Sequence, residues 1–162
     1  MCAMKFPYSG FCASTCPGKN LSNSSLTVNK NSTILQMVEL LVSHPNARFI
    51  AVVDDAGKLL GLIRCKRLFQ AVFSQHNPPD LMLHQLFTFL TSETSGELML
   101  THILTAKEED LLEDIIKTML ENDISSMPIV DEQSHFLGLI TLPQLLEPWL
   151  EKQKQDAGNS SD

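Results

Sequence analysis

The sequence predicts an α/β fold built from two copies of one β-α-β-β-α unit. Residues 51–68 (AVVDDAGKLLGLIRCKRL) and 128–145 (PIVDEQSHFLGLITLPQL) align without a gap at an offset of 77 and are identical at seven of 18 positions. Each segment follows apolar residues at helical spacing and contains two short apolar runs separated by a polar turn. Such an internal repeat indicates two similar units that bury their apolar faces together.

A helix is predicted near the start of each copy. Thr33 with Gln36, and Asp110 with Glu113, have the spacing of a capping box, in which two side chains satisfy the first free amides of a helix. Apolar residues then recur at helical spacing, and their stripe is broader than one small core needs. The offset of 77 pairs the two helices residue by residue: Thr33 with Asp110, Ile34 with Leu111, Val38 with Ile115, and Val42 with Met119.

Short strands and a second helix complete each copy. Apolar runs on either side of a polar turn predict a hairpin, and an extended run precedes each first helix. In the first copy the predicted strands are 26–28, 50–53 and 59–63, and the second helix is 65–73. In the second copy the predicted strands are 103–105, 128–130 and 136–140, and the second helix is 143–150. A unit of about fifty residues buries too little apolar surface alone, so the two copies are expected to pack together.

The predicted organisation has five parts. Asn77-Pro78-Pro79 breaks the chain after the first copy, and a helical-looking stretch follows at 81–90. The parts are an N-terminal extension (1–25), a first repeat (26–76), a connecting segment (77–98), a second repeat (99–150) and a mobile polar tail (151–162).

Composition and charge exclude several classes of protein. The chain has 162 residues, of which 43% are apolar and 19% charged, unlike collagen, a coiled coil or a linker. Its net charge of −7 repels phosphate backbones, so nucleic acid is not an expected partner. Residues 1–10 lack the apolar core of a signal peptide, and the longest uncharged apolar stretch, 81–92, is too short to span a membrane. The predicted location is the cytoplasm.

The cysteines leave two interpretations open for the N-terminal segment. Cys12 and Cys16 have a spacing that zinc tolerates, and Cys2 would add a third ligand in a metal or redox sensor. A structural zinc site needs four ligands, and the five histidines lie at no metal-ligand spacing, so we expect thiols and no metal site. Cys65 is expected to be half-buried, since no partner base is identifiable. The usual enzyme fingerprints are absent, which predicts a protein without catalytic activity.

The order of the elements resembles a known family. A helix, an (I/P)-apolar-Val-Asp string, a turn, Leu-Gly-Leu-Ile and a second helix occur twice, which is similar to the tandem cystathionine-β-synthase (CBS) domain pair, or Bateman module. The resemblance covers about 26–150, and GELML at 96–100 is similar to the short helix that often precedes a second CBS repeat. It implies a pseudo-twofold pair with clefts between the repeats, dimerisation through helices, and a regulatory role. It also implies an adenosine ligand such as AMP, ATP or S-adenosylmethionine.

Carried over residue by residue, the family's ligand-binding positions form two sets. The apolar members would flank a base, Thr141 and Arg64 would face phosphate, and Gln144 and Arg67 stand where ribose acceptors would be. One cleft would be lined by Val28, Ile50, Ala51, Arg64 and Arg67, and the other by Thr105, Met127, Pro128, Thr141 and Gln144.

Both copies depart from the family's Gly-apolar-apolar-Thr-x-x-Asp motif. Copy two keeps Thr141 but replaces the aspartate with Gln144, which either hydrogen-bonds ribose without charge assistance or only caps the helix. Copy one places Arg64, Lys66 and Arg67 at a helix start, where positive charge opposes the helix dipole. These cations predict either an anion-binding site or an exposed cluster that pairs with an acidic surface. Arg67 cannot accept a hydrogen bond, so ribose recognition is not expected in that cleft.

The sequence therefore predicts a non-enzymatic regulatory or sensor protein that binds an adenosine nucleotide or a related small anion. It is expected to form a homodimer and to act on a regulated protein whose identity the residues do not give. The alternative is a ligand-free dimerisation and protein-interaction module whose clefts are filled by side chains.

Overall fold

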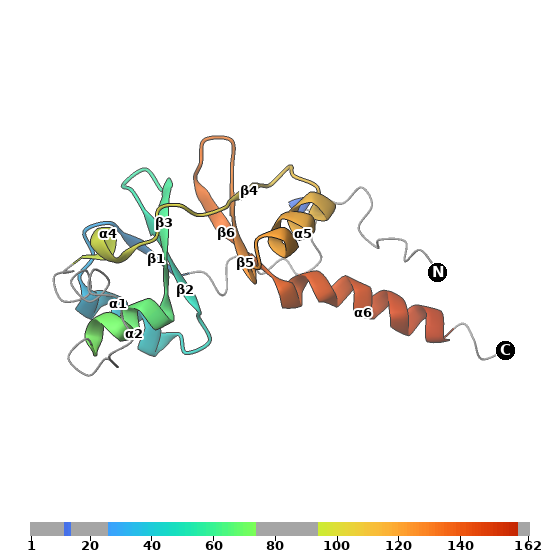
Figure 1. The fold of residues 1–162 in the computed structure, drawn as a ribbon, viewed down its shortest axis with the longest axis horizontal. Helices are drawn as coiled ribbons and strands as arrows, with labels where there is room; N and C mark the ends of the chain where they lie inside the picture. The colour runs from blue at the N-terminus through green and yellow to red at the C-terminus, as the bar shows by residue number, and fades with distance from the viewer. Residues whose placement is uncertain (1–11, 14–25, 74–93, 159–162) are drawn as a thin grey trace. The chain divides into compact units, whose positions relative to one another are not determined.

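The computed structural model describes residues 12–13, 26–73 and 94–158 (Figure 1). The chain divides into two compact units, each centred on one repeat. Of the described residues, one unit contains 26–73, 94–103 and 133–136, and the other contains 12–13, 104–132 and 137–158. Each repeat builds its own three-stranded sheet, which confirms the predicted α/β class.

The first repeat folds in the order β-α-β-β-α. β1 runs parallel to β2, and β2 pairs with β3 as an antiparallel hairpin. At the turn, Asp54 Oδ1 accepts hydrogen bonds from the backbone amides of Ala56 and Lys58, each at 2.9 Å. The predicted strands and helices are thereby confirmed. Their bounds are β1 (Leu26–Asn29), α1 (Ile34–Ser43), β2 (Phe49–Val53), β3 (Leu59–Arg64) and α2 (Cys65–Val72).

The second repeat has the same order of elements. β4 runs parallel to β5, and the strand order of the sheet is β4-β5-β6. A short helix, α4 (Ser95–Leu98), precedes this repeat, as the GELML string predicts. The elements are β4 (Ala106–Lys107), α5 (Leu112–Glu121), β5 (Ser126–Val130), β6 (Phe136–Thr141) and α6 (Leu142–Gly158).

Each repeat packs its helices against one face of its own sheet. A fully buried side chain of this size contributes about 1.5–3 kcal/mol to stability, so each small core depends on several of them. The core of the first repeat includes Met37, Ile50, Val52, Ile63, Leu68 and Leu98. The core of the second includes Leu112, Ile115, Met119, Met127, Ile129, Ile140 and Leu145.

The two first helices begin differently. Thr33 caps α1 as predicted, because its Oγ1 accepts from the Gln36 amide at 3.3 Å and its own amide donates to Gln36 Oε1 at 2.9 Å. The predicted cap at Asp110 is wrong, since the N-cap of α5 is Leu111 and no side chain caps it. Asp110 Oδ2 instead accepts from the Lys107 amide at 2.8 Å, closing the turn before the helix. Because the Asp110 carboxylate bonds to the backbone of the preceding turn, it does not cap α5.

The first helices are also displaced by one residue from the predicted alignment. Ile34 and Leu112 are the first residues of α1 and α5, an offset of 78, whereas the hairpins keep the offset of 77. The second repeat therefore has one residue fewer between its first helix and its second strand. The buried Ile115 corresponds to the buried Met37 and not, as predicted, to the half-buried Val38. The four predicted helix pairings are each wrong by one residue for this reason.

Two predicted boundaries in the second repeat are also wrong. Residues 103–105 do not form a strand, because the sheet begins at Ala106, which is buried and pairs with Ile129. The last helix continues to Gly158, eight residues beyond its predicted end. Its final turns contain glutamate, lysine, glutamine and alanine, which favour a helix without needing an apolar face.

The segment before each repeat packs on the other repeat. Ser95 is fully buried in the first unit, and its amide donates to the carbonyl of Ser32 at 2.8 Å. Ala13 is 1% exposed in the core of the second unit, and its amide donates to the carbonyl of Asp110 at 3.0 Å. Part of the predicted N-terminal extension (1–25) therefore belongs to the core of the second repeat.

Some predictions concern residues outside those described. Cys2, Cys16 and the helical stretch at 81–90 are among them. Within 12–13, 26–73 and 94–158, no three His, Cys, Asp or Glu side chains are grouped to hold a metal ion. Within the same ranges, no helix has the length and apolarity needed to cross a membrane.

Candidate functional site

The last strand of each repeat leads directly into a helix and brings equivalent residues to its start. Arg64 ends β3 and Arg67 lies in the first turn of α2, while Thr141 ends β6 and Gln144 lies in the first turn of α6. The offset of 77 matches Arg64 to Thr141 and Arg67 to Gln144. The structure thus places the four polar residues predicted to contact ligand at two equivalent positions.

The first amide of each of these helices already has a partner. Cys65 donates to the carbonyl of Arg48 at 3.0 Å, and Leu142 donates to the carbonyl of Ser125 at 3.1 Å. These bonds satisfy one of the amides that a helix start otherwise leaves free for an anion. An anion at either helix start would therefore be bound more by side chains, and less by free backbone amides, than we expect from the sequence.

In the second repeat, Thr141 and Gln144 bind each other. Gln144 Oε1 accepts from the Thr141 amide at 2.8 Å and from Thr141 Oγ1 at 2.9 Å. The first bond is the reciprocal half of a capping box, which supports the capping interpretation. The hydroxyl proton that would reach a phosphate is also used in this pair. A ligand at this position would have to exchange that bond for its own.

In the first repeat, the two arginines have different roles. Arg64 is exposed, and within the described residues its side chain forms no hydrogen bond or ion pair. Arg67 Nε donates to the main-chain carbonyl of Leu98 at 2.6 Å, which ties the start of α2 to the end of α4. Burial lowers the pKa of the Arg67 guanidinium from its very high ordinary value. Arg64 is therefore available to an anion, while Arg67 already serves a structural contact.

The remaining residues predicted to line the two clefts point to different faces of their sheets or differ in burial. Ile50 and Met127 are 0% and 1% exposed and belong to the two cores. Ala51 and Pro128 are the next residues along the same strands, so they point to the opposite faces of their sheets, where they are also buried. The two remaining positions are Val28, half-buried in β1, and Thr105, exposed just before β4.

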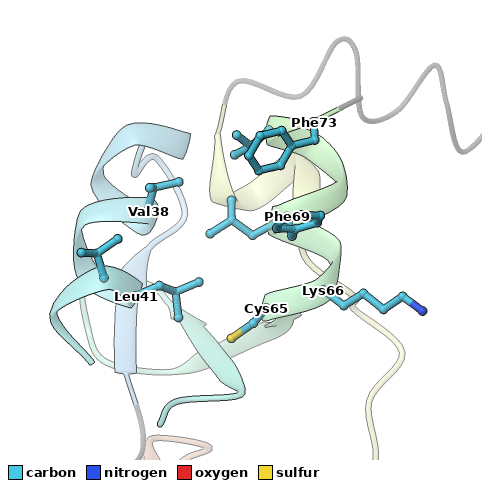
Figure 2. A pocket seen from close by; sticks show the side chains of 9 residues that line it. Val38, Leu41, Cys65, Lys66, Phe69 and Phe73 are labelled. Carbon is cyan, nitrogen blue, oxygen red and sulfur yellow. The ribbon is translucent and has the colours of Figure 1, made fainter. Parts of the chain in front are cut away.

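An apolar groove between α1 and α2 is a feature that the sequence reasoning missed (Figure 2). Phe69 is 63% exposed, and its ring centroid lies 4.6 Å from that of Phe73. The signal in the sequence was the spacing of Phe69, Val72 and Phe73, which form one face of a helix. The groove, of about 460 Å³, is lined by Val38, Leu41, Val42, Cys65, Lys66, Leu68, Phe69, Val72 and Phe73.

Cys65 lies in this groove as a half-buried thiol, as predicted. Its Sγ donates to the carbonyl of Ala47 at 3.2 Å. Burial raises the pKa of the Cys65 thiol, so the reactive thiolate is disfavoured. The groove therefore offers an apolar surface and no activated nucleophile.

The equivalent face of α6 is exposed as well. Leu146, Trp149 and Leu150 are 60%, 38% and 48% exposed. They correspond to Phe69, Val72 and Phe73 by the offset of 77. A hollow of about 610 Å³ along this face is lined by Pro143, Gln144, Leu146, Glu147, Trp149 and Leu150.

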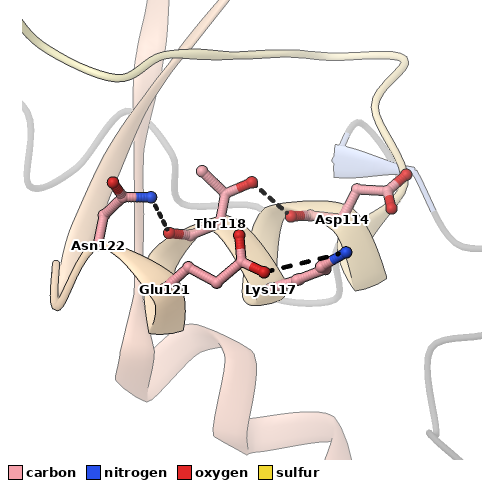
Figure 3. Close-up of polar contacts among 5 residues, drawn as sticks. All are labelled: Asp114, Lys117, Thr118, Glu121 and Asn122. Atoms are coloured by element: carbon pink, nitrogen blue, oxygen red, sulfur yellow. Dashed lines mark hydrogen bonds and ion pairs between the residues drawn. The ribbon is translucent and has the colours of Figure 1, made fainter.

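Polar side chains on α5 interact locally along their own helix (Figure 3). Thr118 Oγ1 donates to the carbonyl of Asp114 at 2.8 Å, and Asn122 Nδ2 donates to that of Thr118 at 2.8 Å. Lys117 and Glu121 form an exposed ion pair at 3.9 Å, one helical turn apart. Such pairs add a few tenths of a kcal/mol to a helix and do not constitute a ligand site.

The family comparison matches both repeats. The model of the CBS domain fits residues 19–74 and 96–149. The homoserine O-acetyltransferase of Methanosphaera stadtmanae is 27% identical over 75% of this chain, and the L-aspartate semialdehyde sulfurtransferase of Methanocaldococcus jannaschii is 25% identical over 75%. This chain covers only 21% and 20% of those two proteins, so their names describe much longer molecules.

Solved structures of similar fold cover most of the chain. CBSX2 in complex with AMP is 23% identical, with a TM-score of 0.68 over 89% of this chain and 99% of that one. The CBS domain pair of MJ0100, in complex with 5′-methylthioadenosine and S-adenosyl-L-methionine, is 22% identical, with a TM-score of 0.64 over 88% and 98%. The duplicated β-α-β-β-α fold and the family match at both repeats agree, and the chain is a member of the CBS domain family.

Proposed function

We propose that this protein is a non-enzymatic regulatory module that binds an adenosine nucleotide, with AMP, ATP and S-adenosylmethionine as the ligands to test. The observation that carries the proposal is the equivalent placement of Arg64 and Thr141 at the starts of α2 and α6 in a chain of the CBS family. The solved relatives that hold AMP or S-adenosylmethionine support this class of ligand.

The chemistry proposed for the second repeat is recognition of ribose and phosphate. Because Gln144 Oε1 already accepts two bonds from Thr141, its amide nitrogen is the group that remains to meet a ribose oxygen. Thr141 would turn its hydroxyl from Gln144 to a phosphate or carboxylate oxygen of the ligand. Pro128 and Thr105 complete this proposed set, with Met127 behind them in the core.

The chemistry proposed for the first repeat is anion binding without ribose recognition. The exposed guanidinium of Arg64 can form two parallel hydrogen bonds to a phosphate. Arg67 is held by the carbonyl of Leu98 and is a cation where a ribose acceptor is needed. Val28 and Ala51 complete this proposed set, with Ile50 behind them in the core.

The proposed assembly is a homodimer in the cytoplasm that acts on a separate regulated protein. Its support is the pair of apolar helix faces, on α1 with α2 and on α6, that remain exposed in the single chain. Exposed apolar patches of this kind mark interaction surfaces. We expect no nucleic acid partner, because the net charge of −7 repels phosphate backbones, and no membrane-spanning segment.

A thermal-shift panel tests the proposal. The whole chain is heated with AMP, ADP, ATP, S-adenosylmethionine or inorganic phosphate, each at increasing concentration. A ligand at 100 times its Kd adds about 2.7 kcal/mol of stability, which raises the Tm by several degrees. A shift with an adenosine compound that exceeds the shift with phosphate supports the proposal. Equal melting temperatures in all solutions contradict it.

The second candidate is a ligand-free interaction module. The observation that favours it is the internal pairing of the proposed ligand-binding groups, Thr141 with Gln144 and Arg67 with Leu98. A chain that is dimeric but unaffected by every compound in the panel would have this function.

A further inference from the structure

Three threonines of this chain have the spacing that acidophilic protein kinases recognise. Such a kinase transfers phosphate to a serine or threonine that has a carboxylate three residues later, because that carboxylate pairs with cations of the kinase. Among the serines and threonines of the chain, only Thr94, Thr105 and Thr118 have an acidic residue at that position. The acidic run is longest after Thr105, since residues 108–110 are all acidic.

Two of the three threonines are held in helical structure. Thr94 forms the capping box of α4 with Glu97, whose carboxylate accepts from the Thr94 amide at 3.1 Å. Thr118 lies within α5, and its Oγ1 donates to the carbonyl of Asp114 at 2.8 Å (Figure 3). A kinase binds its acceptor as an extended segment with a free hydroxyl. Neither threonine can be phosphorylated unless its helix opens first.

Thr105 has the opposite environment. It is exposed and lies directly before β4, outside the helices and strands, and in the part of the chain that the structure describes its hydroxyl forms no hydrogen bond. Glu108 is exposed too and forms no ion pair within the same part, so its carboxylate is available to a kinase. Because β4 has two residues and lies at the edge of its sheet, the segment can extend by breaking few hydrogen bonds.

We propose that Thr105 is phosphorylated by an acidophilic serine/threonine kinase and that the phosphate weakens AMP binding at the second repeat. In this transfer, Thr105 Oγ1 forms a bond to the γ-phosphorus of ATP, the bond from that phosphorus to ADP breaks, and the hydroxyl proton passes to the catalytic base of the kinase. The modified side chain carries a charge of about −1.5 to −2 at neutral pH.

This charge would lie in the set of residues that the proposed function assigns to nucleotide, so it would repel the phosphate of AMP. The effect on AMP therefore rests on the proposed function, whereas the modification of Thr105 does not. By the offset of 77, Val28 is the equivalent residue of the first repeat. Valine has no hydroxyl, so only the second repeat can be switched in this way.

Phosphorylation of the whole chain by a purified acidophilic kinase, with Mg²⁺ and ATP, tests the modification. Peptide mass spectrometry is expected to find one phosphoryl group on Thr105 and none on Thr94 or Thr118, and Thr105→Ala should remove it. Glu108→Gln should slow the initial rate about fivefold, because one contact between exposed charges is lost.

Two matched variants control this experiment. Thr101→Ala changes an exposed threonine that has no acidic residue three positions later, and Glu132→Gln removes an exposed carboxylate outside the acidic run. Both should be phosphorylated at the wild-type rate. Phosphate on a different residue, or on none, overturns the modification. Equal rates for Glu108→Gln and the wild type overturn recognition through the acidic run.

Titration with AMP tests the effect on the ligand. The phosphorylated chain is freed of ATP by gel filtration, and its Kd for AMP should be about tenfold or more above that of the unmodified chain. An unchanged Kd overturns the control of the ligand by the phosphate. If the unmodified chain binds no AMP, nucleotide binding is contradicted, while phosphate on Thr105 still supports the modification. AMP binding by a chain that the kinase leaves unmodified contradicts this inference alone.

Discussion

Arg67 and Leu98 join two elements that are far apart in the sequence. The guanidinium nitrogen Nε of Arg67, in the first turn of α2, donates to the main-chain carbonyl of Leu98, at the end of α4, over 2.6 Å. Leu98 is itself fully buried in the core of the first repeat. The segment that precedes the second repeat is thereby anchored to the first, through the residue that stands where the resemblance to the family predicts a ribose acceptor.

The first prediction compares the two arginines. Arg67→Ala should lower the free energy of unfolding by about 1–2 kcal/mol, because a partly buried carbonyl loses a charged donor. Arg64→Ala should change it by less than about 0.5 kcal/mol, since its side chain is exposed and has no partner in the described residues. Urea unfolding of both variants measures the difference. If the two variants lose the same free energy of unfolding, the hydrogen bond from Arg67 to Leu98 does not stabilise the fold.

The second prediction concerns Gln144. Gln144→Asp places the family's aspartate after Thr141, and we expect AMP affinity to rise about tenfold, because a charged acceptor roughly doubles a hydrogen bond. Gln144→Leu should abolish ribose recognition and cost about 1 kcal/mol of stability through the lost cap. Calorimetric titration with AMP gives the affinities. If neither variant alters the Kd, Gln144 serves only to cap α6.

The third prediction tests the contribution of Ala13 to the second core. Ala13→Lys should destabilise the chain by about 3 kcal/mol or more, because it buries an unpaired charge. The matched control is Ala157→Lys, at an exposed position near the end of α6. Hydrogen exchange should show the loss of protection in α5, whose turn binds the Ala13 amide. If the two variants have the same free energy of unfolding, Ala13 does not contribute to the core of the second repeat.

The fourth prediction is a pH dependence at Asp54. The hydrogen bond from the Lys58 amide lowers the pKa of this carboxyl, with smaller contributions from the Ala56 amide and the Lys58 charge. Because the folded pKa lies below the unfolded value, the stabilisation is present above the unfolded pKa and is lost as pH falls through the folded one. The Tm difference between wild type and Asp54→Asn should therefore shrink toward zero in acid.

A control for this pH effect is Glu132→Gln, which removes an exposed carboxylate at the corresponding turn of the second repeat. Its Tm should follow that of the wild type through the acid range. A difference for Asp54→Asn that stays constant with pH would contradict the assigned role of the charge.

Most of the fold follows from short-range patterns in the sequence. Short apolar runs on either side of a polar turn predicted both hairpins, and the spacing of Thr33 and Gln36 predicted the start of α1. These elements are determined by residues within a few positions of each other. The start of α5 was wrong because Asp110 has two competing local partners, and the spacing of Glu113 alone does not decide between them.

The parts that were missed depend on long-range contacts. Nothing near Ala13 indicates that it enters the core of the second repeat, and Arg67 shows no sequence signal for its bond to Leu98. For the candidate site, sequence reasoning identified the equivalent pairs at the helix starts, but not that Thr141 and Gln144 bind each other through both the amide and the hydroxyl. That a ligand contacts the residues predicted to line the two clefts stays a prediction.

Calorimetric titration of the whole wild-type chain with AMP, followed by competition with S-adenosylmethionine, decides whether this CBS pair binds an adenosine ligand. We expect saturable binding that S-adenosylmethionine displaces and that Arg64→Ala or Thr141→Val weakens without unfolding the chain. Absence of any binding heat at millimolar AMP, together with no displacement of a fluorescent adenosine analogue, would contradict it.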